Sequence, residues 1–391
     1  MNLIKKMITD NIPIHDTKSP SICFVAHFAY GALASIDTGH IGGVERQTSM
    51  MAKWFAKRGW KVSMLTLDEG QADELEVEGV KVYKMCRKEA GIKGLRFFCP
   101  KWTSLNSAMK RANADIYYQN CGGYETGQVA LWCKKHNRKF VYSIASDPDC
   151  DIKLPAMHTQ RDKILYRYGV KHADAIIVQT QRQQMMLQDG FGVQSIIIPM
   201  PCKGVVDSDK NVKRENSSQN NSNVLWVGRI SKEKRFEWLI EVAQKCPDVT
   251  FNVLGMANTD SEYSDTLIRK SSEIPNIKML GRVQHSDIYK YYLSSRALCC
   301  TSSYEGFPNT FLEAWSCGVP VVSTFDPDGI IAKYNLGWTA SNIDELAASI
   351  NESMTCKDKW QTTSKNAREY FLKNHTLEAS MDKFVQIFQE V

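Results

Sequence analysis

The feature that most constrains the fold of this chain is an alternation of short β-branched runs with amphipathic segments of helical length. Within 391 residues the pattern occurs as two series. The first series predicts strands at 21–27, 61–67, 80–85, 115–120, 139–145, 174–180 and 195–201. The second predicts strands at 223–229, 249–255, 276–282, 297–303 and 319–324. Such alternation is typical of parallel sheets covered by helices, so we expect an α/β protein with two doubly wound sheets.

A domain boundary is expected between the two series. Residues 207–223 read DSDKNVKRENSSQNNSN, a polar stretch without periodicity that could not bury a core of its own. A chain of this length is also too long for one ordinary core. We therefore expect an N-terminal Rossmann-like domain over 1–206, a linker over 207–222 and a C-terminal Rossmann-like domain over 223–375. A final helix over 376–391 could pack back on the N-terminal domain.

Composition excludes several classes of protein. With 43% apolar and 24% charged residues, the chain resembles soluble globular proteins. The uncharged stretch 21–36 is too short to cross a bilayer, and no signal-peptide pattern follows the start, so we expect a cytoplasmic protein. The 12 cysteines form no CxxC pair or Cys/His cluster, which disfavours a zinc site or a disulfide framework.

The net charge of +6 is unevenly distributed, with its positive excess in the first half of the chain. Residues 81–111 contain nine Lys or Arg and one acid, together with Leu95, Phe97, Phe98 and Trp102. This mixture suits binding to the anionic inner face of a membrane. A solvated basic loop whose aromatic side chains pack in the core would have the same composition. The chain lacks a recognisable nucleic-acid-binding module, so nucleic acid is not expected as a partner.

Three predicted loops between strands and helices could carry chemistry. Gly42 and Gly43 precede a helix, where two unprotected backbone amides would attract phosphate, unless the glycines only permit a tight turn. In VGRISKEKRFEWLI, residues 227–240, Gly228 and Arg229 end a strand and Lys234 follows. Each cation at 4 Å from a diphosphate would contribute about 4 kcal/mol to binding before desolvation is subtracted. The alternative interpretation of this segment is a run of solvated charges at the start of a helix.

The third loop is SSYEGFPNTFLEAWSCGVPVVST, residues 302–324, with a carboxylate at each end of an apolar stretch. Pro308 and Asn309 suit the beginning of a helix, so Glu305 would stay in the loop and Glu313 would lie in the second turn. A helical projection places Glu313 on the side away from the apolar packing face. A carboxylate there, which only accepts hydrogen bonds, suits the paired hydroxyls of a ribose or hexose. No G-x-G-x-x-G or GxxxxGK[ST] motif supports NAD or P-loop binding.

In order and spacing these segments resemble glycosyltransferase family 4, retaining enzymes of the GT-B fold. The resemblance rests on the E-x7-E spacing from Glu305 to Glu313, on the VGRISKEKR segment and on GGVERQ far upstream. It implies two Rossmann-like domains facing a central cleft, with a nucleotide-sugar donor held mainly by the second. Arg229 and Lys234 match the pair that binds the donor diphosphate, and Glu313 matches the carboxylate that binds the ribose. Residues 281–287 match the edge along which the base lies.

The resemblance thereby implies a set of site residues. The donor set is Gly42, Gly43, Gly228, Arg229, Lys234, Val283, Glu305, Gly306, Phe307, Asn309, Thr310 and Glu313. The catalytic candidates are Arg229, Lys234, Glu305 and Asp147. The chain departs from the family in one respect, because SIASDPDCD stands where members often carry a histidine. Asp147 or Asp149 could replace that histidine; His27 and His158 are other candidates.

The pattern D-x-D occurs at Asp147, Asp149 and Asp151, and again at 207/209 and 326/328. Glycosyltransferases of another fold use this pattern to hold a metal, but here cations already supply the counter-charge, so we expect no essential metal or other cofactor.

The resemblance thus implies a retaining transferase that moves a hexose or N-acetylhexosamine from a UDP-sugar to a glycan or lipid-linked glycan acceptor in surface polysaccharide biosynthesis. A nucleotide-sugar epimerase of the same architecture and a non-catalytic sugar-nucleotide or glycan binding protein are the alternatives.

Overall fold

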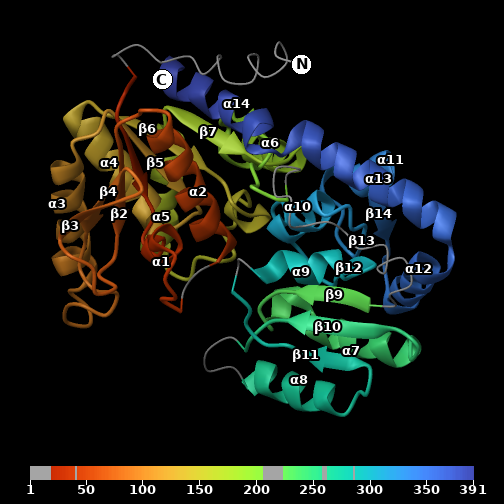
Figure 1. Ribbon diagram of the computed structural model, residues 1–391. Helices are drawn as coiled ribbons and strands as arrows, with labels where there is room; N and C mark the ends of the chain where they lie inside the picture. The colour runs from red at the N-terminus through yellow and green to blue at the C-terminus, as the bar shows by residue number, and fades with distance from the viewer. Residues whose placement is uncertain (1–18, 40–41, 206–222, 258–261, 285–286) are drawn as a thin grey trace, which may run out of the picture. The chain divides into compact units, whose positions relative to one another are not determined.

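The chain divides into two compact units, each built around one sheet (Figure 1). The computed structural model describes residues 19–39, 42–205, 223–257, 262–284 and 287–391. The predicted linker at 207–222 lies outside the described residues. Unit 1 comprises residues 1–178, 186–196 and 383–391, and unit 2 comprises 179–185 and 197–382. Each unit is an α/β domain of Rossmann-like character, as the sequence pattern predicts.

The sheet of unit 1 has eight strands in the order β3-β4-β2-β1-β5-β6-β7-β8. Its central strands run parallel, and β3 pairs antiparallel with β4 at the edge. The strands are β1 (Ile22–Val25), β2 (Val62–Thr66), β3 (Glu74–Val77), β4 (Val80–Lys84), β5 (Ile116–Asn120), β6 (Lys139–Ser143), β7 (Ala175–Val178) and β8 (Ile196–Ile197). The helices that accompany it are α1 (Tyr30–Ala34), α2 (Gly43–Lys57), η1 (Phe97–Trp102), α3 (Thr103–Ala112), α4 (Tyr124–His136), η2 (Asp147–Asp149), α5 (Gln160–His172), α6 (Gln181–Phe191) and α14 (Leu377–Glu390). Helices α6 and α14 each begin in residues that belong to unit 2.

Aromatic side chains of β5 fill the core of unit 1 on both faces of its sheet. Tyr118 packs against Phe384 and Phe388 of α14, and Phe388 also contacts Phe55 of α2. The next residue, Tyr117, points to the opposite face, where its ring meets Trp132 of α4. Successive strand residues face opposite sides of a sheet, so this alternation places helices on both faces.

The sheet of unit 2 has six parallel strands in the order β11-β10-β9-β12-β13-β14. The strands are β9 (Asn223–Val227), β10 (Thr250–Leu254), β11 (Ile277–Met279), β12 (Ala297–Cys300), β13 (Val321–Ser323) and β14 (Gly337–Thr339). The helices are η4 (Lys232–Lys234), α7 (Phe236–Lys245), α8 (Glu262–Ser272), α9 (Ile288–Leu293), α10 (Asn309–Ser316), η6 (Pro327–Gly329), α11 (Ile330–Tyr334), α12 (Ile343–Thr355) and α13 (Lys357–Asn374).

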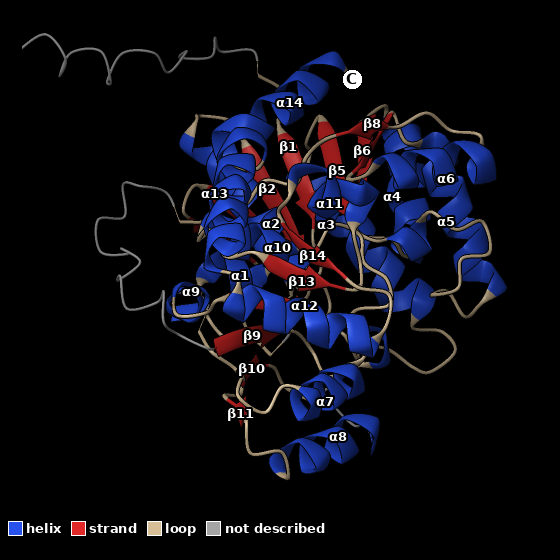
Figure 2. Cartoon of the chain, turned by 90° about the vertical axis from the view of Figure 1, so that its right-hand side faces the viewer, coloured by secondary structure: helices blue, strands red, loops and turns tan. Residues whose placement is uncertain are grey.

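Two apolar clusters cover the two faces of this second sheet, and Figure 2 shows its strands with helices on either side. One cluster joins Val224 and Trp226 of β9 to α7, α8 and α12. The other joins Leu225 of β9 to α9, α10 and α13. Because the neighbouring residues of β9 face opposite clusters, the strand is buried on both sides, as expected for a central parallel strand.

Both sheets reverse their strand order beside their first strand. In unit 2 the chain proceeds from β9 to β10 and β11 on one side and to β12, β13 and β14 on the other. In unit 1 the corresponding reversal lies between β1 and β5. In open α/β sheets, ligands bind beyond the carboxyl ends of the strands at such a reversal. The loops after β9 and β12 and those after β1 and β5 are therefore the places to look for function.

Candidate functional site

The loop after β9 and the loop after β12 lie side by side because their strands are neighbours. The backbone of Ser303 donates a hydrogen bond to the carbonyl of Glu233 at 2.8 Å, which ties the two loops together. Beside them Gly228 directly follows β9, and its carbonyl oxygen would lie 2.4 Å from a Cβ added at Gly255. Only glycine fits at position 255 without moving this backbone. The result is a rim of backbone and short side chains at the carboxyl edge of the sheet.

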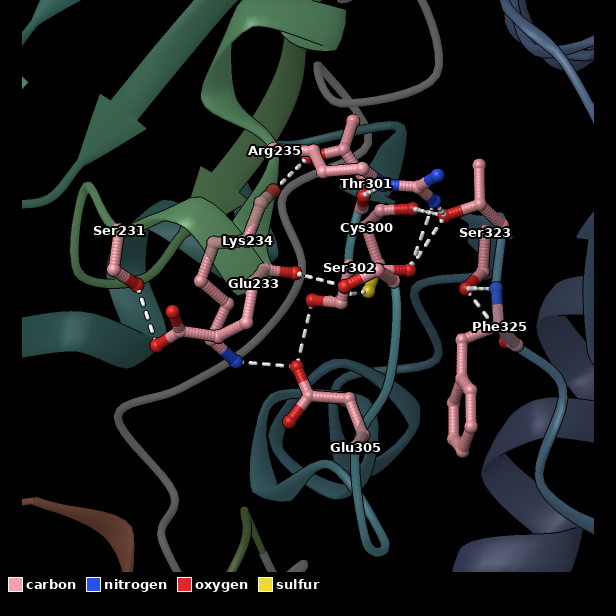
Figure 3. A network of polar contacts seen from close by, with 12 residues as sticks. Ser231, Glu233, Lys234, Arg235, Cys300, Thr301, Ser302, Glu305, Ser323 and Phe325 are labelled. Carbon is pink, nitrogen blue, oxygen red and sulfur yellow. Dashed lines mark hydrogen bonds and ion pairs between the residues drawn. The ribbon is translucent and has the colours of Figure 1, made fainter. Parts of the chain in front are cut away.

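Two predicted site residues meet at this rim (Figure 3). The ammonium group of Lys234 contacts Oε1 of Glu305, and both side chains are largely buried, with exposed fractions of 24% and 17%. The hydroxyl of Ser302 donates a second hydrogen bond to the same carboxylate oxygen at 2.6 Å. The two residues are 71 positions apart in the sequence, so the fold creates the pair. A cation held by a carboxylate in this way has a fixed position and still reaches the surface.

Arg235 also links the two loops (Figure 3). Its guanidinium donates to the carbonyls of Thr301 and Ser302 at 2.7 and 3.0 Å and to the Thr324 hydroxyl at 2.8 Å. The Thr301 hydroxyl in turn donates to the carbonyl of Lys234 at 2.5 Å. Arg235 therefore stabilises the backbone that carries both Lys234 and Glu305. The basic run of the sequence contained this residue, but only the fold distinguishes its role from that of Lys234.

The other predicted donor residues near this rim differ in their surroundings. Arg229 is exposed and makes no hydrogen bond or ion pair within the described part of the chain, so its guanidinium is available to a ligand. Gly306 is buried. The backbone amide of Phe307 donates to Oε1 of Gln179 at 2.7 Å, a contact over 128 positions that no local sequence pattern indicates. Val283 is half-buried against the apolar cluster around α10.

Helix α10 begins at Asn309, with Thr310 next and Pro308 at the N-cap, as predicted. The expectation that Glu313 faces away from the packed side is wrong. Every residue from 311 to 316 is buried, and Glu313 is only 7% exposed. The helix is enclosed by the sheet, α9 and α13, so it has no solvent side over this stretch. Oε2 of Glu313 accepts a hydrogen bond of 2.7 Å from the hydroxyl of Tyr292 in α9, a residue that the sequence interpretation missed.

In unit 1 the predicted phosphate site at Gly42 and Gly43 also needs correction. Gly42 is the N-cap of α2 and Gly43 its first residue. The amide of Gly42 is not unprotected, because it donates a hydrogen bond of 2.9 Å to Oε2 of Glu45. One of the two amides predicted to bind phosphate is therefore already hydrogen-bonded to a carboxylate. The signal was in the sequence, since Glu at the third helical position often turns back to the N-cap amide.

The aspartates predicted to replace the family histidine lie in η2, after β6. Asp147 and Asp149 are both buried. Asp149 accepts hydrogen bonds of 3.4 Å from the amide of Gly122 and the hydroxyl of Ser146, and burial raises its pKa to about 6. Asp149 therefore sits directly against the loop that follows β5. Which aspartate takes the histidine's role stays a prediction.

The two histidine candidates have different environments. His27 follows β1, and its Nδ1 lies 3.8 Å from Oε1 of Glu125. Burial lowers the pKa of His27 below its usual value, although the carboxylate of Glu125 opposes the shift. His158 is exposed on the loop before α5. Of the two, only His27 lies at the strand-order reversal of unit 1.

Among the D-x-D aspartates that the structure describes, those at 326 and 328 accept hydrogen bonds from backbone amides near helix starts. Asp326 accepts hydrogen bonds from the amides of Ile331 and Ala332, and Asp328 accepts from the amides of Gln181 and Arg182 at the start of α6. Asp207 and Asp209 lie outside the described residues. Within the described ranges, no group of three or more His, Cys, Asp or Glu side chains is arranged to hold a metal ion. None of the helices in those ranges is both long and apolar enough to cross a membrane.

Comparison with known families accounts for both units. Residues 207–370 match the family described as glycosyl transferases group 1, and residues 42–197 match the glycosyl transferase 4-like domain. The chain belongs to the GT4-type glycosyltransferases. The matched segments contain the Lys234–Glu305 pair and Glu313 in one domain and Asp147 in the other.

This glycosyltransferase is similar in sequence to relatives from several bacteria. An uncharacterized glycosyltransferase of Haemophilus influenzae is 23% identical over 74% of this chain and 78% of its own length. The GtfA subunit of a UDP-N-acetylglucosamine–peptide N-acetylglucosaminyltransferase of Streptococcus pneumoniae is 30% identical over 44% of this chain and 35% of its own length. The O-antigen chain mannosyltransferase B of Escherichia coli is 28% identical over 35% of this chain and 38% of its own length. The chain thus spans well under half of the last two relatives.

Solved structures show the same fold over nearly the whole glycosyltransferase chain. Sucrose-phosphate synthase from Thermosynechococcus elongatus has a TM-score of 0.77 at 19% identity, covering 95% of this chain and 98% of that one. HepE of Anabaena, solved in complex with UDP-glucose, has a TM-score of 0.71 at 18% identity, covering 95% and 100%. The fold is GT-B.

Proposed function

We propose that this chain is a retaining glycosyltransferase that moves a hexose or N-acetylhexosamine from a UDP-sugar to a hydroxyl of a glycan or lipid-linked glycan acceptor in surface polysaccharide biosynthesis. The observation that carries the proposal is the meeting of Lys234 and Glu305 at the carboxyl edge of β9 and β12. The S. pneumoniae relative is named for a UDP-N-acetylglucosamine donor, and the E. coli relative for O-antigen synthesis. HepE was solved with UDP-glucose.

The reaction needs positive charge where this pair lies. The bond between the anomeric carbon and the diphosphate oxygen breaks, and its electron pair stays with the nucleoside diphosphate. The acceptor hydroxyl oxygen bonds to the same face of that carbon, and its proton leaves with the diphosphate. Lys234 and the exposed Arg229 would stabilise the charge that develops on the leaving group more strongly than the charge of the ground state, which raises the rate. These fixed cations supply the counter-charge, so the proposed reaction needs no metal.

Incubation with a panel of nucleotide sugars tests this proposal and separates it from its alternatives. UDP-glucose, UDP-galactose, UDP-N-acetylglucosamine and GDP-mannose are each supplied with and without a glycan acceptor. Release of nucleoside diphosphate that rises with acceptor supports transfer, and proton NMR of the product gives the anomeric configuration. An altered donor sugar without acceptor would indicate an epimerase instead. Tight donor binding without turnover would indicate a binding protein.

The segment that follows β4 supports an anionic membrane surface as a further partner. Ile92, Leu95 and Phe98 are large apolar side chains exposed by 73%, 63% and 58%. Lys93 and Lys101 lie between and beside them, and neither makes an ion pair within the residues that the structure describes. Exposed apolar side chains with cations beside them suit the boundary of an anionic bilayer. Such a surface would bring a lipid-linked acceptor to unit 1.

The aromatic residues of this segment are divided between core and surface. Phe97 is buried against Trp102 and Tyr124, with the guanidinium of Arg161 3.8 Å from its ring centre, whereas Phe98 points outward. Sedimentation with phosphatidylcholine vesicles, with and without phosphatidylglycerol, tests the surface. Phe98→Glu should abolish binding to the anionic vesicles. Met185→Glu, a control that is exposed by 59%, should retain it. Equal recovery with both vesicle types would contradict the proposed surface.

A further inference from the structure

A buried tyrosine lies directly against the carboxylate of Glu313. Tyr292 belongs to α9, and its side chain is completely buried in the apolar cluster that also contains Phe311 and Leu312 of α10. Its hydroxyl donates a hydrogen bond of 2.7 Å to Oε2 of Glu313. A hydroxyl in an apolar cluster requires a partner, because leaving it unsatisfied would cost about 1 to 3 kcal/mol. The two residues therefore constrain one another.

The direction of this hydrogen bond is fixed by its surroundings. Burial raises the pKa of the Tyr292 hydroxyl well above its usual value, and the negative charge of Glu313 adds to this effect. The hydroxyl therefore keeps its proton. The carboxylate of Glu313 must then be the acceptor. Both side chains are held by rigid elements, Tyr292 by α9 and Glu313 by α10. Oε2 of the Glu313 carboxylate is therefore held in place before any ligand binds.

Orientation matters for a carboxylate that binds a vicinal diol. The two hydroxyls of a ribose diverge at fixed angles, and a carboxylate accepts both only when its plane is aligned with them. A carboxylate free to rotate would lose conformational freedom on binding, and that loss would weaken the complex. A hydrogen bond that already orients the carboxylate, such as the one from the Tyr292 hydroxyl, lowers this entropic cost.

We propose that Tyr292 is a positioning residue that orients the Glu313 carboxylate toward the vicinal hydroxyls of the donor's ribose, making the site selective for ribonucleotides over 2′-deoxyribonucleotides. This inference rests on the proposed function, because it assumes a nucleotide donor with its ribose at Glu313. It adds a residue, from a different helix, whose contribution depends on the sugar of the nucleotide. A core hydrogen bond that serves only the packing of α9 against α10 would show no such dependence.

Calorimetric titration with UDP and 2′-deoxy-UDP tests the inference. The wild-type protein is titrated first with UDP, GDP and ADP, and the nucleotide that binds is used with its 2′-deoxy analogue. Tyr292→Phe should weaken binding of the ribonucleotide about 10-fold, the loss expected for one hydrogen bond to a charged group. Binding of the 2′-deoxy analogue should weaken less than about 2-fold, because half of the diol contact is already missing. KM for the donor should rise with the dissociation constant while kcat stays nearly unchanged.

Two further variants separate positioning from packing. Tyr291→Phe removes a hydroxyl from the same helix, where the ammonium of Lys290 lies 5.4 Å from the centre of the tyrosine ring, and should bind both nucleotides like the wild type. In a Glu313→Gln background, Tyr292→Phe should cost little extra ribonucleotide affinity, because the charged acceptor is gone.

Three results would overturn the inference. Equal weakening for both nucleotides would assign Tyr292 to packing alone. Unchanged affinity in Tyr292→Phe would remove it from the site. If the wild-type protein bound no nucleoside diphosphate, the proposed function would fail and this inference with it. Only the first two results leave the proposed function standing, so the two failures are distinguishable.

Discussion

Replacement of Lys234 by alanine is the perturbation for which the structure gives the largest functional effect with the smallest structural one. Lys234 contacts Glu305 at the rim of unit 2 and is partly exposed, so the ion pair itself contributes about 1 kcal/mol to stability. The same ammonium placed 4 Å from a diphosphate oxygen contributes about 4 kcal/mol before desolvation at an effective dielectric near 20. Loss of one such stabilising group lowers turnover about 10² to 10³-fold.

The assay measures kcat from nucleoside diphosphate release at saturating donor, alongside thermal unfolding of each variant. Lys232→Ala is the matched control, because Lys232 lies in the same turn and its side chain is exposed. We expect Lys234→Ala to lose 10² to 10³-fold in kcat with little change in Tm, and Lys232→Ala to resemble the wild type. Turnover of Lys234→Ala within about 3-fold of wild type would refute the electrostatic role argued from this geometry.

Three other outcomes follow from the structure. Arg235→Ala should destabilise unit 2 by about 2 to 3 kcal/mol in urea unfolding, since it removes hydrogen bonds to Thr301, Ser302 and Thr324, and a loss below about 0.5 kcal/mol would show that these contacts contribute little. The pKa of Asp149 is raised to about 6 by burial, so the folded state binds more protons than the unfolded state between about pH 4 and 6, and stability falls as pH rises through this window. Asp149→Asn should remove that part of the fall, on the order of 3 kcal/mol, and an unchanged pH profile of unfolding would contradict the assigned environment. Addition of EDTA should leave turnover unchanged, whereas loss of turnover that manganese restores would show that a metal is required.

The sequence predicted the strands and loops well because their signals are local. All twelve predicted runs contain a strand of one of the two sheets, and the loops that carry Lys234 and Glu305 were identified from strand ends and charge. Strand β3 was missed because it is only four residues long, ELEV, and two of these are glutamates, which are depleted in strands. Strand β14 was missed because it has only three residues.

The errors at the candidate site arise from tertiary contacts that a helical projection cannot contain. Projection assumes that a helix has one packed side, but α10 is enclosed by the sheet, α9 and α13, so Glu313 is buried. Its partner Tyr292 is 21 residues away on another helix, and nothing in the local pattern links the two. By contrast, the hydrogen bond between Glu45 and the Gly42 amide is a local helix-capping contact and could have been predicted.

A crystal structure with a bound UDP-sugar, or with UDP alone, would locate the diphosphate relative to Lys234 and Glu305. We expect the diphosphate at the carboxyl edge of β9 and β12, with its oxygens within hydrogen-bonding distance of Lys234 and Arg229 and the ribose hydroxyls on Glu313. A nucleotide bound elsewhere, or a diphosphate that touches neither cation, would contradict this expectation.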